Sequence, residues 1–197
     1  MPRPPQTDQK RKELLPVVAE AFGELGYRRA TTAELAQRCG VQENILYRLW
    51  PDKKAMFIAA IEYVYEQAAQ TWRELLSENA NGSDTAMKLL NYEADHYGEA
   101  ELHRIIFAGL SETDEPQIRE AMRTMYKRFH QFIRTQVTSH RQSEQKGLPP
   151  DETVSAWAIV GLANMANIGR ELELFSSRGR RKMFADVGRL LLDGRHE

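Results

Sequence analysis

Polar residues between positions 42 and 48 have the types and the spacing of a nucleic-acid-binding helix. Five of them point outward if the segment is helical: Gln42, Glu43, Asn44, Tyr47 and Arg48. The apolar side chains of Leu46, Leu49 and Trp50 then face inward. Amide, guanidinium and carboxylate groups match the donors and acceptors of base edges, and hydroxyl groups bind phosphates. The segment therefore predicts a helix that contacts DNA.

Two pairs of residues near this segment could bind the phosphate backbone. Lys53 and Lys54 would lie in the first turn of the next helix, where the helix dipole disfavours cations but the free amide groups attract anions. Thr31 and Thr32 begin the preceding helix and offer hydroxyl and amide groups to another phosphate. Helix caps and solvated charges are the alternative explanation for all four residues.

Two short helices joined by a tight turn would position these residues. Thr31 and Glu34 form a capping box that starts a helix over 31–39, which Gly40 ends. A second helix covers 42–50. This arrangement is typical of a helix-turn-helix that packs on the preceding helix, although a plain helical hairpin produces the same pattern.

These residues resemble the signature of the TetR/AcrR-type transcriptional regulators. The matching residues are Gly26, Tyr27, Thr31, Thr32, Ala33, Glu34, Leu35, Ala36, Gly40, Val41, Leu46, Tyr47, Trp50 and Lys53. The match covers about residues 10–57, and the rest of the chain is similar in length and helix content. The resemblance implies a homodimeric regulator, usually a repressor. Such a protein leaves its palindromic double-stranded DNA operator when a small-molecule effector enters a pocket in the helical body.

The same resemblance assigns roles to individual positions. Thr31 or Thr32, together with Tyr47 and Lys53, would contact phosphates. The positions that would face the bases are Gln42, Glu43, Asn44, Ile45 and Arg48.

The recognition segment departs from the usual pattern at several positions. Gln42 stands where a serine is usual, Asn44 replaces a small Gly or Pro, and Leu49 replaces a common histidine. Glu43 brings a negative charge to the DNA-facing side. That charge is tolerated if it meets a cytosine amino group or pairs with Arg48 or Lys53, so we expect an operator unlike those of relatives.

Composition limits the possible function classes. The chain has 197 residues, 22.7 kDa and a net charge of −1, but residues 1–57 hold ten Lys/Arg against seven Asp/Glu. One cysteine, Cys39, excludes a disulfide framework and a multi-cysteine zinc site. We find no apolar leader, and the longest uncharged run, 153–169, contains two asparagines, so a cytoplasmic protein without a membrane span is expected.

Helical periodicity extends over almost the whole chain and predicts an all-α fold of about nine helices. The expected helices are 10–25, 31–39, 42–50, 52–78, 84–97, 100–111, 115–141, 151–175 and 180–193. Pro16 requires the first helix to start near Lys12 or to bend. We expect a helix-turn-helix domain over 1–57 and a ligand-binding and dimerisation domain over 58–197. Residues 1–7, which contain three prolines, would form a flexible arm.

Aromatic, methionine and histidine side chains of the body are candidates for an effector pocket. They are Tyr63, Tyr92, His96, His103, Phe107, Met125, Tyr126, Phe129, Trp157 and Asn164. Such a stripe at helical spacing is also what an ordinary core looks like. Asn164 and Asn167, within an apolar helix, need partners if they are buried, in the dimer or in a ligand. A metal effector is a further alternative, because Glu99 and His103 have chelate spacing.

The last two helices are candidates for a dimer face. Small residues allow close helix approach, and an apolar stripe runs along the first of the two helices: Val154, Ala158, Leu162, Met165, Gly169 and Leu172. Two such helices, doubled by two-fold symmetry, give a four-helix interface. Packing within one chain is the alternative. The basic cluster 178–182 is expected in a solvated loop or paired with Glu171 or Glu173.

An enzyme is the competing class, but the chain has no GxSxG, HExxH, P-loop or dinucleotide fingerprint. We therefore expect neither a catalytic residue nor a cofactor nor a resident metal. A second alternative is a DNA-binding protein that is controlled by a protein partner instead of a small ligand.

Overall fold

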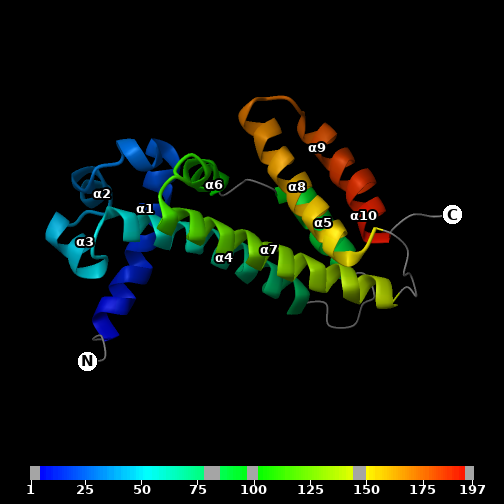
Figure 1. Cartoon of the computed structure of the whole chain (residues 1–197), viewed down its shortest axis with the longest axis horizontal. Helices are drawn as coiled ribbons and strands as arrows, with labels where there is room; N and C mark the ends of the chain where they lie inside the picture. Colours follow the sequence, from blue (N-terminus) through cyan, green and yellow to red (C-terminus); the bar gives the residue numbers. More distant parts are fainter. Residues whose placement is uncertain (1–4, 78–84, 97–101, 144–149, 194–197) are drawn as a thin grey trace. The chain divides into compact units, whose positions relative to one another are not determined.

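All regular elements that the computed structural model describes, over residues 5–77, 85–96, 102–143 and 150–193, are helices (Figure 1). In order they are α1 (Pro5–Arg29), α2 (Thr32–Arg38), α3 (Glu43–Leu49), α4 (Lys53–Ser77), α5 (Thr85–His96), α6 (His103–Leu110), α7 (Pro116–Ser143), α8 (Glu152–Glu171), α9 (Ser177–Met183), the π-helical turn η1 (Phe184–Gly188) and α10 (Arg189–Asp193). The all-α prediction is confirmed. Within these ranges, none of the helices combines the length and the apolar character that a membrane span requires.

The chain folds into two compact units. Unit 1 comprises Met1–Ala68 and Ala100–Met125, and unit 2 comprises Ala69–Glu99 and Tyr126–Glu197. Unit 1 therefore contains α1, α2, α3 and α6, with the first parts of α4 and α7. The predicted functional boundary between 57 and 58 stays a prediction, because compactness does not show where a function ends.

Helix α1 begins earlier than the sequence predicted and continues through Pro16. Of the predicted arm over 1–7, residues 1–4 lie outside the described residues, and 5–7 are already helical. Gly26 interrupts the helix, with φ 73° and ψ 162°, so the predicted ending at this glycine holds. A last turn then follows as far as Arg29.

The α2–α3 connection has the geometry of a helix-turn-helix. The hydroxyl of Thr31 accepts a hydrogen bond from the Glu34 amide at 3.2 Å, which caps α2. Gly40 adopts φ 64°, a left-handed conformation that costs a glycine little. In this conformation the next amide, that of Val41, donates to the Ala36 carbonyl at 3.0 Å and ends α2.

Aromatic side chains form the centre of unit 1. The rings of Phe22 and Phe57 meet edge to face at 5.0 Å, and Tyr27 lies 4.9 Å from Phe57. Leu35 of α2 and Leu46 of α3 are fully buried. Helices of seven residues are marginal by themselves, so α2 and α3 depend on this core for their position.

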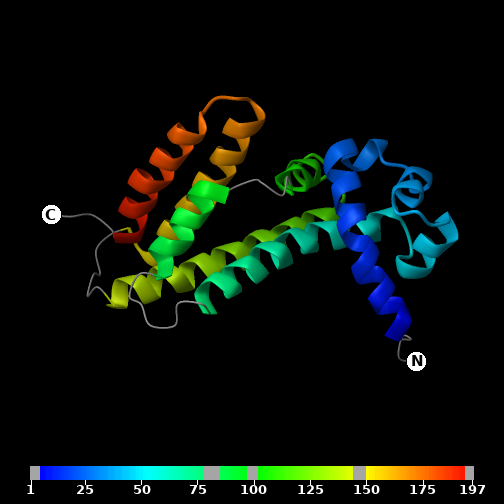
Figure 2. The same ribbon diagram turned by 180° about the vertical axis from the view of Figure 1, so that it is seen from behind.

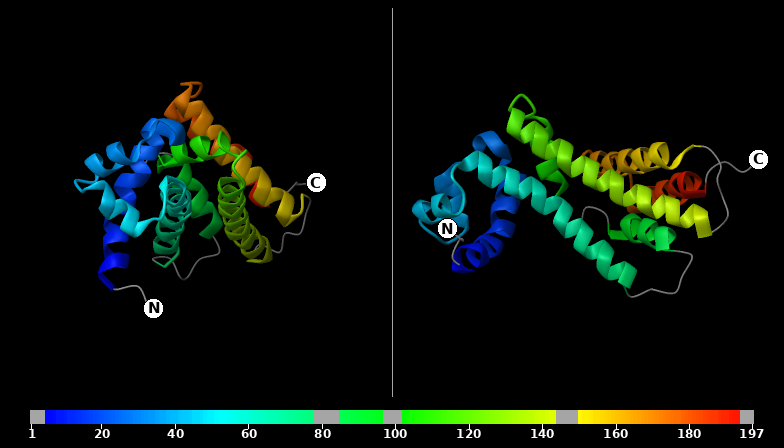
Figure 3. Two further views of the ribbon diagram at one scale, coloured as in Figure 1. Left: turned by 60° about the vertical axis from the view of Figure 1, so that its left-hand side comes forward. Right: turned by 60° about the horizontal axis from the view of Figure 1, so that its bottom comes forward.

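Unit 2 has a separate core in which α5 lies beside the C-terminal helices, as the green and red ribbons show (Figures 2 and 3). Its buried members include Leu90, Val137, Ala166 and Phe184. Trp72 of α4 stacks on Phe132 of α7 at 4.5 Å, within the same unit.

The predicted helix over 180–193 is longer in the structure, since α9, η1 and α10 follow one another without a break.

A buried arginine joins three helices of unit 2. Arg141, at the end of α7, has 2% of its surface exposed. Its guanidinium donates hydrogen bonds to four oxygen atoms: the carbonyls of Pro150, Leu191 and Leu192 and the hydroxyl of Ser155. Beside it, His140 Nε2 lies 2.9 Å from Asp193 Oδ1. These contacts fix the end of α10 against α7 and α8.

Candidate DNA-binding surface

Helix α3 presents a polar face to solvent and an apolar face to the core of unit 1. Leu46, Leu49 and Trp50 are buried, and Ile45 is half-buried. The predicted outward-facing residues are all exposed: Gln42, Glu43, Asn44, Tyr47 and Arg48. The helix thus offers amides, a carboxylate, a phenol and a guanidinium along one side.

Arg11 of α1 holds the C-terminal end of α3, a role that sequence reasoning missed. Its guanidinium donates to the backbone carbonyl of Leu49 and lies 5.9 Å from the centre of the Trp50 ring. A cation at a helix C-terminus is favourable because the last carbonyls lack partners. The signal in the sequence is weak, because the two elements are 38 residues apart.

Thr31 and Thr32, both predicted as phosphate contacts, are engaged within the protein. Thr31 caps α2 through its hydroxyl. The Thr32 hydroxyl donates to Glu43 Oε2 at 2.7 Å and accepts from the Tyr47 hydroxyl at 3.1 Å. The structure therefore brings Thr32, Glu43 and Tyr47 together, which the sequence did not predict.

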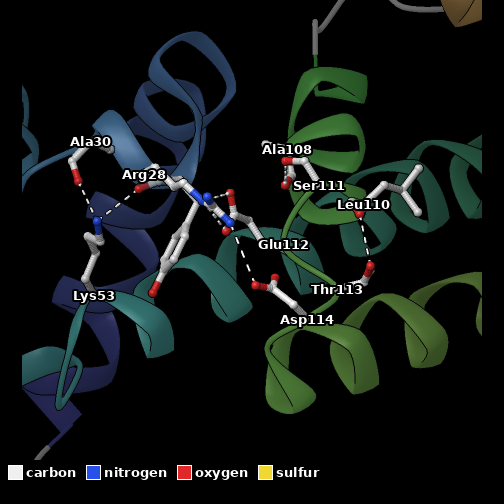
Figure 4. A network of polar contacts seen from close by, with 10 residues as sticks. Arg28, Ala30, Lys53, Ala108, Leu110, Ser111, Glu112, Thr113 and Asp114 are labelled. Atoms are coloured by element: carbon white, nitrogen blue, oxygen red, sulfur yellow. Dashed lines mark hydrogen bonds and ion pairs between the residues drawn. The ribbon is translucent and has the colours of Figure 1, made fainter.

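Lys53 has a structural role besides the predicted contact with phosphate. Its ammonium donates to the carbonyls of Tyr27 and Ala30, both at 3.0 Å, and Figure 4 shows Lys53 beside Ala30. The ammonium also lies 4.6 Å from the centre of the Tyr27 ring. These carbonyls end α1, so the cation lies where a helix terminus attracts it. Two of its three N–H groups are used in this way.

An acidic segment between α6 and α7 neutralises other cations of unit 1. Arg28 Nε donates to both carboxylate oxygens of Glu112, at 2.9 and 3.0 Å, and a second nitrogen lies 3.8 Å from Asp114 (Figure 4). Lys54 donates to Glu115 at 3.0 Å. The hydrogen bond and charge of Glu115 raise the pKa of Lys54 above its usual value. Arg28 and Lys54 are therefore not uncommitted cations, unlike Arg48, which makes no such contact in the described part of the chain.

The predicted pocket residues of unit 1 are engaged in packing. His103 and Met125 are buried, and the rings of His103 and Phe107 meet edge to face at 6.0 Å. Tyr63 is half-buried, and burial raises the pKa of its phenol.

The predicted pocket residues of unit 2 also have partners in the protein. The Tyr126 hydroxyl donates to Asn164 Oδ1 at 3.1 Å, and Asn164 Nδ2 donates to the Val160 carbonyl at 3.0 Å. Burial raises the pKa of Tyr126, and this hydrogen bond partly offsets the shift. Phe129 meets Trp72 edge to face at 5.7 Å.

The remaining three residues of the predicted pocket, Trp157, Tyr92 and His96, differ in how far the side chain is exposed or described. Trp157 stacks on His130 at 4.4 Å yet keeps 45% of its surface exposed. Tyr92 is half-buried. The side chain of His96 and the whole of Glu99 lie outside the described residues. A ligand-binding role for this set stays a prediction.

A hollow of about 570 Å³ lies in unit 2 at the turn between α8 and α9. Its lining residues are Ala166, Arg170, Glu173, Phe175, Ser176, Ser177 and Arg180, none of them among the ten predicted pocket residues. The solvated loop expected for the basic cluster 178–182 is not formed, because this segment is helical. Arg181 pairs with Asp95 at 2.5 Å, and Lys182 pairs with Asp186 at 2.5 Å.

Helix α8 exposes an apolar stripe, but some residues that were predicted to belong to this stripe are buried. Leu162 and Gly169 belong to the buried side. The exposed apolar side chains of α8 and its C-terminal cap are Val154, Trp157, Met165, Ile168 and Leu172. Val187 and Leu190 add exposed apolar surface in the following helices.

The geometry defines a class: an all-helical protein whose helix-turn-helix presents an exposed polar helix. Residues 15–60 match the family model described as bacterial regulatory proteins, tetR family. This segment of the chain is therefore a TetR-type helix-turn-helix, a DNA-binding domain, and the chain as a whole has the fold of solved TetR-family regulators.

Known proteins are similar to this chain in sequence or in fold. The nucleoid occlusion factor SlmA of Vibrio cholerae is 28% identical over 156 residues, which are 77% of this chain and 79% of the relative. A TetR-family regulator from Cytophaga hutchinsonii has a TM-score of 0.78 at 15% identity, covering 99% of this chain and 100% of the other. The regulator FadR of Bacillus subtilis, in complex with stearoyl-CoA, has a TM-score of 0.70 at 16% identity, covering 94% and 99%.

Proposed function

We propose that this chain binds a two-fold symmetric DNA site as a homodimer, represses transcription in the cytoplasm, and releases the DNA when a small molecule binds its helical body. The observation that carries the DNA-binding part is the exposed polar face of α3. Arg48 lies on this face without a partner in the described part of the chain, so its guanidinium is available to a guanine or a phosphate. Gln42, Asn44 and Tyr47 lie on the same side.

The apolar stripe of α8 supports the homodimer. Leu172 has 64% of its surface exposed, Val154 53% and Leu190 54%. Contiguous apolar surface of this kind is unfavourable in water and typical of interfaces. A second copy of the same chain would cover it in a two-fold arrangement, and two heads would then meet successive major grooves about 34–36 Å apart.

Control by a small molecule is supported by a protein of the same fold, since FadR of Bacillus subtilis was solved with stearoyl-CoA. Control by a protein partner is the second candidate, supported by the sequence similarity to the nucleoid occlusion factor SlmA. Either effector needs a coupling of only about 1–3 kcal/mol to change DNA affinity 5–150-fold. Equal affinity of a ligand for the free and the DNA-bound protein would exclude that ligand as the effector.

The proposal is tested by binding to the DNA directly upstream of the gene, over about 50–200 mM salt, with a scrambled fragment as control. We expect tight binding to a two-fold symmetric sequence. The log of the affinity should fall linearly with the log of the salt concentration, with a slope of about −0.9 for each phosphate that the protein neutralises. A promoter fusion tests repression, and addition of the effector should restore its expression. Weak, equal binding to both fragments would contradict this gene-proximal site. Binding that responds only to a purified protein partner would favour the second candidate.

A further inference from the structure

Helix α3 carries a carboxylate that the neighbouring helix α2 holds in place. Glu43 is the first residue of α3 and is exposed. Its Oε2 accepts the Thr32 hydroxyl at 2.7 Å, and the oxygen of that hydroxyl accepts the phenol of Tyr47 at 3.1 Å. Tyr47, Thr32 and Glu43 thus form a chain of two hydrogen bonds that ends at the carboxylate.

This carboxylate has no compensating cation in the described part of the protein. Lys53 is bound to two backbone carbonyls and to the face of Tyr27. Arg48 makes no ion pair with Glu43 within the described residues. The two protein cations that could have neutralised Glu43 therefore do not do so. A negative charge facing phosphates is unfavourable unless the DNA supplies a donor.

Cytosine supplies such a donor in the major groove. Its N4 amino group donates there, whereas thymine presents the O4 acceptor and guanine presents O6 and N7 acceptors. A carboxylate accepts only, so it would repel thymine and guanine at the same position. Adenine offers an amino group next to the N7 acceptor and is an intermediate case.

We propose that Glu43 reads a cytosine in each half of the operator, accepting a hydrogen bond from N4 through Oε1 while Thr32 holds Oε2. Thr32 and Tyr47 are then positioning residues for Glu43 and not mainly phosphate contacts. This inference rests on the proposed function, because it requires that α3 enters the major groove.

The test is selection from randomised double-stranded DNA with the full-length protein, followed by affinity measurements on single-base variants of the selected site. For the wild type we expect a cytosine whose replacement by thymine lowers affinity about tenfold. Replacing the cytosine by its analogue with hydrogen in place of the 4-amino group should give a similar loss. Glu43→Gln should reduce both losses to less than about threefold and shift the preference towards adenine, since Gln pairs with adenine N6 and N7.

Two further variants separate positioning from phosphate binding. Thr32→Val removes the hydroxyl at nearly constant volume and should weaken the cytosine preference, whereas Thr32→Ser should restore it. Glu20→Gln removes the same charge from an exposed position of α1 and should leave the preference unchanged. Circular dichroism and thermal unfolding would be used to check that each variant folds.

Different outcomes contradict different parts of the account. A selected site whose cytosine preference is the same in Glu43→Gln would overturn this inference and leave the DNA-binding proposal intact. An equal loss for all sequences in Thr32→Val would show a phosphate contact and overturn the positioning role. A folded wild-type protein that selects no sequence would overturn both proposals.

Discussion

Helices α2 and α3 expose polar side chains, whereas α8, η1 and α10 expose apolar ones. In unit 1, Glu43, Tyr47 and Arg48 face solvent over a buried aromatic core. In unit 2, Leu172 and Leu190 are more than half exposed, and polar groups such as Arg141 are buried. The difference fits the two partners proposed above, DNA and a second copy of the chain, because a polyanion in water is bound by polar groups and an apolar stripe is covered by another protein surface.

Most basic side chains of unit 1 that lie near α3 are paired within the protein. Several cations of unit 1 are bound to nearby oxygens: Arg28 to Glu112, Lys54 to Glu115, and Lys53 to the end of α1. The positive charge of residues 1–57 is therefore smaller in effect than the sequence count indicates. In the proposed DNA complex, base and phosphate contacts would therefore depend on few side chains, among them Arg48, and substituting one of them should change DNA binding strongly.

The largest effect is expected for Arg141→Ala in unit 2. The change leaves four oxygen acceptors without their donor, three of them backbone carbonyls, and should lower the free energy of unfolding by about 3 kcal/mol or more. Urea unfolding followed by circular dichroism measures it. Arg134→Ala, at an exposed position of the same helix, is the matched control and should change stability by less than about 0.5 kcal/mol. Equal effects would contradict the structural role of Arg141.

The next effect tests the apolar stripe directly. Met165→Glu with Leu172→Glu places two charges on it and should convert a dimer into a monomer of 22.7 kDa in analytical ultracentrifugation. The expected cost is about 2 kcal/mol or more per buried charge. Leu110→Glu, an exposed leucine of unit 1, serves as control and should leave the mass unchanged. A dimer that survives both substitutions in α8 would require a different interface.

A smaller effect compares two neighbouring lysines. Lys53→Ala removes two hydrogen bonds to the end of α1 and should lower stability by about 2 kcal/mol, measured by thermal unfolding. Lys54→Ala removes a partly exposed ion pair, which solvent screens, and should lower stability much less than Lys53→Ala does. Lys53→Ala should in addition weaken binding to all DNA sequences alike. A larger loss for Lys54→Ala would reverse the assignment of their roles.

The smallest effect concerns Tyr126 at alkaline pH. Burial raises its pKa above the usual 10.0, so the folded protein keeps the phenolic proton longer than the unfolded chain does. The resulting stability is present below pH 10.0 and is lost as pH rises through the folded pKa. The loss should be smaller in Tyr126→Phe when both proteins are unfolded in urea from pH 8 to 11. Identical pH profiles would show that Tyr126 contributes nothing to this loss.

The sequence predicted the helix-turn-helix well because its determinants are local. The Thr31 cap, the left-handed Gly40 and the burial of Leu46, Leu49 and Trp50 all follow from residues within about one helical turn of one another. The roles of Lys53 and Arg11 could not be derived in this way. Their partners lie 23 to 38 residues away and depend on how the helices pack.

The body was harder to predict for the same reason. Periodicity placed α8, but it did not show which side of the helix faces the core. Leu162 and Gly169 were therefore assigned to the exposed stripe although they are buried, and Trp157 was assigned to a pocket although it is half exposed. Aromatic residues at helical spacing do not distinguish a core from a binding site, and Tyr126 and Asn164 show the problem by bonding to each other.

The stoichiometry of the protein on its selected DNA site, measured by analytical ultracentrifugation at about 100 mM salt, shows whether a dimer binds DNA. Full-site and half-site duplexes of equal length would be compared. The account predicts two chains on the symmetric site, much weaker binding to the half-site, and loss of full-site binding in the Met165→Glu, Leu172→Glu protein. One chain bound per duplex, with equal affinity for full and half sites, would contradict the division of labour between a polar DNA-binding region and an apolar dimer face.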